Sequence, residues 1–210
     1  MTPKVQACIT SRDGHVHFRT LQAVDAACSY AMSMGIAEAQ GLVCQNPYGV
    51  AHCRNQAVAD LLSSDATHLL FVDDDVLVPE NVLEKLLAAG MPIVSGCCPC
   101  VSIVNDSVNG SAYINARFDG KWADGWFDGL QSAEAVGAGC ILIGREVLEE
   151  IGFPWFTWGE HQRGNRVYFT SDDVQFCNRA SELGYKIFAH GNVRCRHFKV
   201  LDVGELLERD

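Results

Sequence analysis

Short apolar segments alternate with helical patterns over the first hundred residues. Four of these segments have the length and composition of buried strands, at 5–10, 41–45, 68–72 and 91–98. Between them, apolar side chains recur every three or four residues and predict three helices, at 16–34, 51–64 and 79–90. This order is typical of βαβ units, so we expect an α/β fold with a largely parallel sheet.

The pattern changes after Cys100. Residues 101–126 are rich in Gly, Asn, Asp and aromatic side chains, and they predict a β-hairpin that turns near Asp119–Gly120. The later segments are predicted as a strand, a short helix, a long aromatic loop, a helix and two strands, at 133–144, 145–152, 153–169, 171–184, 185–190 and 193–198. We therefore expect one domain over residues 1–200, with a mostly parallel mixed sheet flanked by helices, and a C-terminal tail over 201–210.

Composition and charge limit the possible functions. The 210 residues are 48% apolar and 20% charged, as in ordinary folded proteins. The net charge is −10 and no basic run occurs, which argues against a nucleic-acid-binding surface and favours a small anion held through a metal. No signal-peptide-like segment begins the chain and no run of 18 apolar residues follows, so we expect a cytoplasmic protein without a membrane span.

Ten cysteines are scattered along the chain, and without a secretion signal we expect reduced thiols. Cys97, Cys98 and Cys100 lie together after a predicted strand. A zinc site would need a second pair, or a histidine, at matching spacing. Buried thiols are therefore the simpler interpretation, and a structural zinc is the alternative.

Three consecutive aspartates follow four apolar residues in the stretch HLLFVDDDVLVPE. Adjacent carboxylates repel one another, so a positive group must lie among them unless they form a solvated acidic turn. Alternate strand side chains share a side, which predicts that Asp73 and Asp75 lie together and chelate one cation. Oxygen ligands at the carboxyl end of a strand suit Mg²⁺ or Mn²⁺.

Two further groups are candidates for this site. Ser171 is a predicted helix N-cap, and Asp172 and Asp173 suit the positive end of that helix, so these acids have a structural explanation as well as a catalytic one. Arg54 lies beside Asn55 on the helical face of Val58 and Leu61. Its inward-facing guanidinium therefore needs a phosphate or an aspartate as its partner.

Taken together, these segments resemble the GT-A fold of nucleotide-sugar glycosyltransferases, particularly small members akin to family 2. The resemblance runs from the first strand through His197 and is strongest over 52–87, where an Arg-Asn helix precedes a DxD motif. Residues 136–152 are similar to the acceptor-side segment of that family. Residues 171–197 resemble its acidic-pair helix, strand and closing histidine, with Asp172–Asp173 in place of the usual Glu-Asp.

The resemblance implies a metal-dependent, inverting transfer of a sugar from a UDP-sugar or similar donor to a hydroxyl of a glycan, a small molecule or a modified biopolymer. The implied ligands of Mn²⁺ or Mg²⁺ are Asp73, Asp75 and His197. The implied nucleotide-sugar contacts are Asp13, Arg54, Asn55, Asp73, Asp74 and Asp75. Asp173 would be the general base, and Asp172 would support it.

Two other functions remain open from the sequence. The apolar strand and its aspartates also fit a haloacid-dehalogenase-like phosphohydrolase, although that fold needs its nucleophilic aspartate near the start of the chain. Here two predicted strand-helix units precede Asp73. A non-catalytic nucleotide-sugar-binding module is the third possibility, and turnover distinguishes it from an enzyme.

Overall fold

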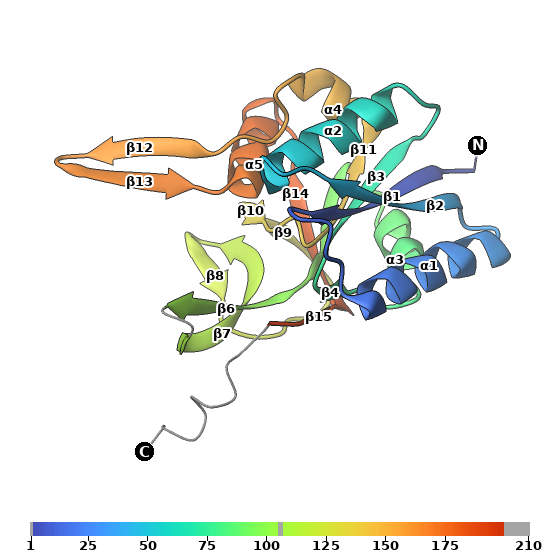
Figure 1. The fold of residues 1–210 in the computed structure, drawn as a ribbon, viewed down its shortest axis with the longest axis horizontal. Helices are drawn as coiled ribbons and strands as arrows, with labels where there is room; N and C mark the ends of the chain where they lie inside the picture. Colours follow the sequence, from blue (N-terminus) through green and yellow to red (C-terminus); the bar gives the residue numbers. More distant parts are fainter. Residues whose placement is uncertain (1, 105–106, 200–210) are drawn as a thin grey trace, which may run out of the picture.

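A computed structural model describes residues 2–104 and 107–199 of the chain. Its central sheet has seven strands in the order β2-β1-β3-β11-β5-β14-β9 (Figure 1). Their bounds are β1 Lys4–Ser11, β2 Glu38–Gln45, β3 His68–Asp73, β5 Ile93–Cys97, β9 Leu130–Ala133, β11 Cys140–Gly144 and β14 Ile187–Arg194. Five of them run in one direction, and β9 and β11 run in the other. The expected single α/β domain with a mostly parallel mixed sheet is confirmed.

Helices cover both faces of this sheet. Their bounds are α1 Phe18–Ser33, α2 Val50–Leu62, α3 Val82–Ala88, α4 Arg145–Ile151 and α5 Asp172–Glu182. Helices α1 and α3 pack on one face, and α2, α4 and α5 pack on the other (Figure 1). Strand β3 supplies both cores, because Leu70 and Val72 lie in the first while Leu69 and Phe71 lie in the second. Burial on both faces explains its continuous apolar run.

Smaller strands lie beside the carboxyl edge of the sheet. Their bounds are β4 Val76–Leu77, β6 Pro99–Val104, β7 Ser107–Phe118, β8 Lys121–Ala123, β10 Ala135–Val136 and β15 Arg196–His197. Strands β7 and β8 form the predicted hairpin, whose turn has positive φ at Asp119 (48°) and Gly120 (76°). The predicted strand 133–144 is instead split into β10 and β11, which belong to different sheets. Glycine at 137 and 139 marks the break.

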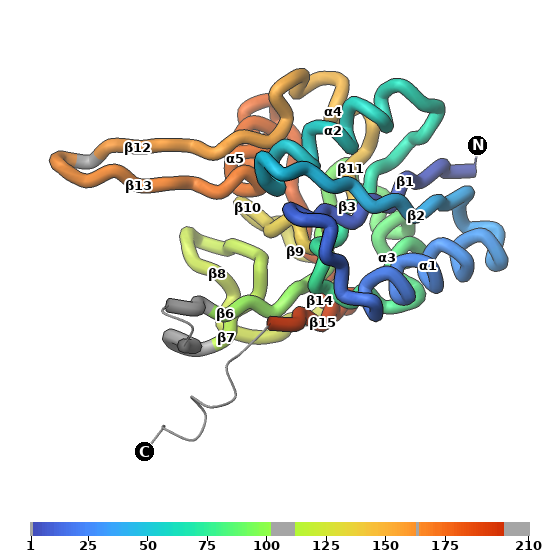
Figure 2. The backbone as a smooth tube through the Cα atoms, in the orientation of Figure 1, coloured from blue at the N-terminus to red at the C-terminus, as the bar shows by residue number. Residues whose placement is uncertain are grey.

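The predicted aromatic loop is a second hairpin, formed by β12 Gly159–Arg163 and β13 Arg166–Thr170. The loop prediction was wrong because apolar and polar residues do not alternate in either strand, and the apolar side chains of β13 are exposed and not buried on one face. The hairpin extends away from the body of the molecule (Figure 2). The two strands predicted near the end are β14, which has an irregularity after His190, and the short β15. The predicted tail 201–210 lies outside the described residues.

Candidate functional site

The three aspartates lie at the carboxyl end of β3, where the strand stops. Strand β3 ends at Asp73, and Asp74 and Asp75 form a turn before β4. The predicted placement of Asp73 and Asp75 on one strand face is therefore wrong, because strand alternation does not continue through a turn. Each of the two carboxylates instead has partners of its own.

Asp73 is held by a buried arginine. The Arg54 side chain on α2 is 4% exposed; its Nη2 lies 2.9 Å from Asp73 Oδ1 and its Nη1 lies 2.8 Å from Asp172 Oδ2. Burial alone lowers the pKa of Arg54, but the nearby carboxylates of Asp73, Asp172 and Asp173 outweigh burial and raise it. The sequence left a phosphate or an aspartate as the partner of Arg54, and the structure shows two aspartates. Arg54 thereby links the DxD turn to the start of α5.

The break between β10 and β11 passes close to both acidic groups. A Cβ atom added at Gly139 would lie 3.2 Å from Asp73 Oδ2, and one at Gly137 would lie 3.1 Å from Asn115 Cβ and 3.5 Å from Asp173 Oδ2. Asn115 is buried; its side chain accepts a hydrogen bond from the Cys98 amide and donates one to the Gly137 carbonyl. Small residues therefore keep the space beside the acids open.

Asp173 is anchored at the start of α5, with Ser171 at the predicted N-cap. Its Oδ1 accepts hydrogen bonds from the Ser171 hydroxyl and, at 2.8 Å, from the Val174 amide. Its Oδ2 accepts from the Ala138 amide at 3.3 Å. The half-buried carboxylate is thus held next to the open strand break, whereas Asp172 is buried against Arg54.

Asn55 does not contact the acidic groups as Arg54 does, but bonds to the backbone of another segment. Its Nδ2 donates to the Phe156 carbonyl, and its Oδ1 accepts from the amides of Trp155 and Phe156. The amide therefore anchors the segment between α4 and the β12–β13 hairpin. These bonds use both ends of the side chain, so the geometry gives no support to the predicted nucleotide contact of Asn55.

Asp75 lies between two cationic side chains from the end of the core. Its Oδ1 is 2.9 Å from His197 Nε2, and its Oδ2 is 2.8 Å from Lys199 Nζ. Sequence reasoning did not identify Lys199, because a lysine beyond the last strand carries no motif. Burial opposes the charged form of Asp75, but the nearby positive charges of His197 and Lys199 lower the pKa of this carboxyl below its ordinary value.

The His197 ring is oriented by its other nitrogen. Nδ1 lies 2.9 Å from the Pro99 carbonyl oxygen, which can only accept, so Nδ1 carries a hydrogen. Nε2 is buried and close to Asp75, but it is not aligned for a hydrogen bond. Burial alone would lower the pKa of His197, and the neighbouring Asp75 raises it to about 10.

The Asp75 carboxylate oxygen and His197 Nε2, once the proton on Nε2 is displaced, would make a donor pair that suits Mn²⁺. Over residues 2–104 and 107–199, no three His, Cys, Asp or Glu side chains come close enough together to hold a metal ion. The structure thus brings together Asp75 and His197 but not Asp73, which faces Arg54 and also accepts a bond from Thr10 at 3.3 Å. A metal role for Asp73 stays a prediction.

A cavity of about 440 Å³ opens beside Asp75. Its lining residues are His15, Val16, His17, Asp74, Asp75, Phe198 and Lys199. Asp74 is half-buried, and burial raises the pKa of its carboxyl. Asp13 is exposed in the loop that leads to the cavity, where it accepts a hydrogen bond from the His15 amide at 2.9 Å. Both predicted nucleotide contacts therefore lie near the open end of the site.

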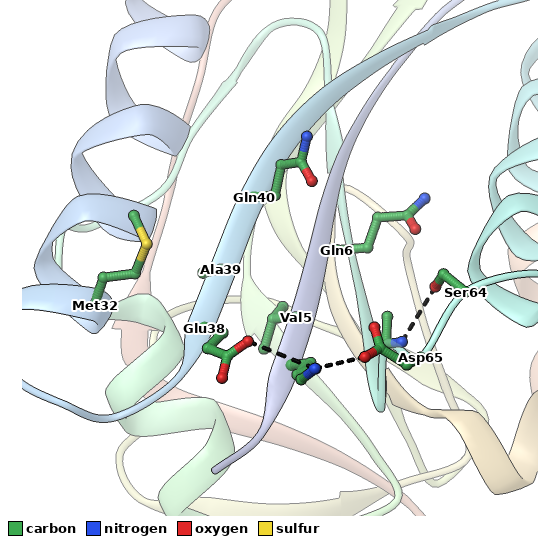
Figure 3. Close-up of a pocket in the computed structure, with 10 residues that line it drawn as sticks. Val5, Gln6, Met32, Glu38, Ala39, Gln40, Ser64 and Asp65 are labelled. Carbon is green, nitrogen blue, oxygen red and sulfur yellow. Dashed lines mark hydrogen bonds and ion pairs between the residues drawn. The ribbon is translucent and has the colours of Figure 1, made fainter.

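Another cavity, of about 400 Å³, lies at the opposite edge of the sheet (Figure 3). It is bordered by the amino ends of β1 and β2, where Lys4 pairs with Glu38 and Asp65. None of the predicted site residues lines it. Ligands of open α/β sheets bind at the carboxyl ends of strands, so we place the site at the cavity beside Asp75.

The cysteine cluster lies at the junction of β5 and β6. Cys97 and Cys98 are buried and Cys100 is half-buried, and all three are free thiols. Burial raises the pKa of the Cys97 thiol to about 12, which keeps it protonated at neutral pH.

Comparison with known proteins supports the fold. No family model and no curated protein matches the chain. The crystal structure of A197 from STIV matches with a TM-score of 0.61 and 20% identity, over 94% of this chain and 86% of that one. The crystal structure of GalNAc-T7 with UDP, GalNAc and Mn²⁺ matches with a TM-score of 0.60 and 13% identity, over 96% of this chain and 44% of that one.

The chain therefore has a GT-A-like fold, as the resemblance implied, and it spans less than half of the GalNAc-T7 glycosyltransferase chain. At these identities the likeness establishes the fold alone. Within the described residues, no helix combines the length and the apolar character that crossing a bilayer requires.

Proposed function

We propose that this protein is a metal-dependent glycosyltransferase that moves a sugar from a nucleotide diphosphate sugar, of the UDP type, to an acceptor hydroxyl. The observation that carries the proposal is the Asp75–His197 donor pair at the carboxyl edge of a GT-A-like sheet, next to a cavity of about 440 Å³. GalNAc-T7, which shares this fold, was crystallised with UDP and Mn²⁺.

In this proposal the donor nucleotide occupies the cavity lined by Asp74 and approached by Asp13. Asp75 and His197 would hold Mn²⁺ or Mg²⁺, which would supply positive charge to neutralise the departing diphosphate. Arg54 is assigned to the two aspartates and not to the phosphates. It fixes Asp73 in place, and Asp172 completes its buried ion pair. A rigid Asp73 is then available to accept hydrogen bonds from hydroxyls of the donor.

Asp173 is the proposed general base. The amides of Val174 and Ala138 and the Ser171 hydroxyl fix its carboxylate beside the strand break at Gly137–Gly139. A base so positioned takes the proton of the acceptor hydroxyl as that oxygen attacks the sugar from the side opposite the leaving diphosphate. This arrangement corresponds to inversion at the transferred sugar.

The phosphohydrolase alternative has less support. The aspartate that would serve as its nucleophile, Asp73, has Oδ1 bonded to Arg54 and close to Thr10, and two strand-helix units precede it. The fold comparison also supports a GT-A-like fold, in which the proposed transferase site has its place.

A thermal-shift screen of nucleotide sugars with and without Mn²⁺ tests the proposal. A ligand at one hundred times its dissociation constant stabilises the native state by about 2.7 kcal/mol. We expect a UDP-sugar to raise the melting temperature with Mn²⁺ present and to have little effect without it. The Asp75→Asn variant should lose this shift, while the exposed control Asp124→Asn should keep it. If no nucleotide or nucleotide sugar changes the melting temperature, the proposal is refuted.

A further inference from the structure

Lys199 is a charged group at the site that no motif predicts. Its Nζ lies 2.8 Å from Asp75 Oδ2, on the side of the carboxylate opposite the oxygen that His197 approaches. The Lys199 and Asp75 side chains are 35% and 31% exposed, so the pair lies at the mouth of the site and not in the core. Both oxygens of the proposed metal-binding carboxylate thus already face a cationic group.

The backbone holds this segment against the aspartate turn. Strand β15 pairs with β4, and the Phe198 amide donates to the Asp75 carbonyl at 2.9 Å. The Phe198 ring stacks on His17, with centroids 4.5 Å apart, and His17 donates its amide to the Asp74 carbonyl. These contacts fix the chain on both sides of the cavity. The long lysine side chain that follows can still move between Asp75 and the cavity that it lines.

We infer that Lys199 is a counter-ion with two positions: it neutralises Asp75 in the ligand-free protein and moves onto the diphosphate when a divalent cation takes its place. This inference rests on the proposed function, and it deepens that function by coupling two ligands. The ammonium competes with the cation for Asp75, and once released it adds a charged hydrogen bond to a phosphate oxygen. Binding of the cation and of the diphosphate therefore strengthen one another through Lys199.

Coupling through Lys199 predicts that one variant binds Mn²⁺ more tightly and pyrophosphate more weakly. In Lys199→Met the competitor is gone, so Mn²⁺ alone should bind about two- to fivefold more tightly, as expected for loss of a partly exposed ion pair. With Mn²⁺ saturating, inorganic pyrophosphate should bind roughly tenfold more weakly, because a charged donor is lost. Lys199→Arg keeps the positive charge, so its affinities for Mn²⁺ and for pyrophosphate should both stay close to those of the wild type.

The measurement is Mn²⁺ binding by electron paramagnetic resonance and pyrophosphate binding by calorimetry, on the full chain. Lys186→Met is the matched control, because it removes one positive charge at an exposed position of the sheet's far end and should change both affinities little. A melting curve confirms that each variant is folded.

An unchanged or weakened Mn²⁺ affinity in Lys199→Met, relative to Lys186→Met, would overturn the inference. Unchanged pyrophosphate affinity would overturn it as well. The proposed function has its own outcome: if the two opposite shifts occur but no nucleotide sugar binds, the counter-ion role stands and the transferase assignment falls. If nucleotide sugars bind with Mn²⁺ and Lys199→Met behaves like the control, the transferase assignment stands and the counter-ion role falls.

Discussion

Removal of Arg54 is the sharpest test of how the acidic groups are held. In Arg54→Met the apolar stem keeps most of its volume, but the guanidinium that bridges Asp73 and Asp172 is lost. The Asp172 side chain is 4% exposed, so its charge is left buried without a partner. Asp73 is 30% exposed and can be partly solvated, so it contributes less to the loss.

Breaking a buried ion pair by removing one partner typically costs about 3–5 kcal/mol. In a chain of this size each kcal/mol lowers the melting temperature by about 2–4 °C, so we expect a fall of roughly 6–20 °C. Urea denaturation followed by circular dichroism measures the free energy of unfolding directly. The exposed control Arg19→Met should stay within about 0.5 kcal/mol of the wild type.

A second substitution separates loss of charge balance from loss of packing. In the Arg54→Met background, Asp172→Asn removes the unpaired charge and should recover a large part of the lost stability. If Arg54→Met loses less than about 1 kcal/mol, or if the double variant is less stable than the single one, the buried ion pair does not hold the site together. Normal stability with lost nucleotide affinity would instead favour a phosphate contact for Arg54.

Three further predictions concern the metal pair and the base. Asp75→Asn and His197→Ala should each weaken Mn²⁺ binding by about tenfold or more while the protein stays folded; calorimetry that shows wild-type affinity in both would remove the pair as a metal site. Because Asp75 raises the pKa of His197 to about 10, Mn²⁺ must displace a proton from Nε2 at neutral pH, so its apparent affinity should rise by up to about tenfold per pH unit between about pH 6 and 8. A flat pH profile would exclude His197 as a ligand. Asp173→Asn should bind the donor normally and lose at least about a hundredfold in transfer rate; near-normal turnover would leave Asp173 as a helix-capping charge.

The sequence predicts most of the fold because apolar periodicity is a local property. Strand β3 and helices α1, α2 and α5 follow directly from the spacing of their apolar residues. The β12–β13 hairpin does not, because it packs on no core and its exposed residues follow no two-residue apolar pattern. The direction of β11 is also not encoded locally. It depends on pairing with β3 and β5, which the chain reaches only after the intervening strands β6–β10.

The sequence places the candidate residues on their elements but does not show which of them pair. That Arg54 lies on an inward face could be read from helical spacing, but its bridge to Asp172 joins residues 118 positions apart. Strand alternation cannot show that β3 ends at Asp73, and this end determines where each carboxylate goes. Lys199 lies 124 positions from Asp75, and no spacing rule connects them.

The three consecutive aspartates are compatible because the structure gives each a different environment. Asp73 faces inward to a buried guanidinium, Asp74 borders the cavity in a setting that raises its pKa, and Asp75 faces outward between an imidazole and an ammonium. The Arg54–Asp172 pair behind Asp73 is enclosed and should be nearly insensitive to salt, whereas the Asp75–Lys199 pair is about one-third exposed on both sides and exchangeable. An arrangement with one fixed and one replaceable set of counter-charges is what a site needs to stay folded when empty and still accept a cation with an anionic ligand.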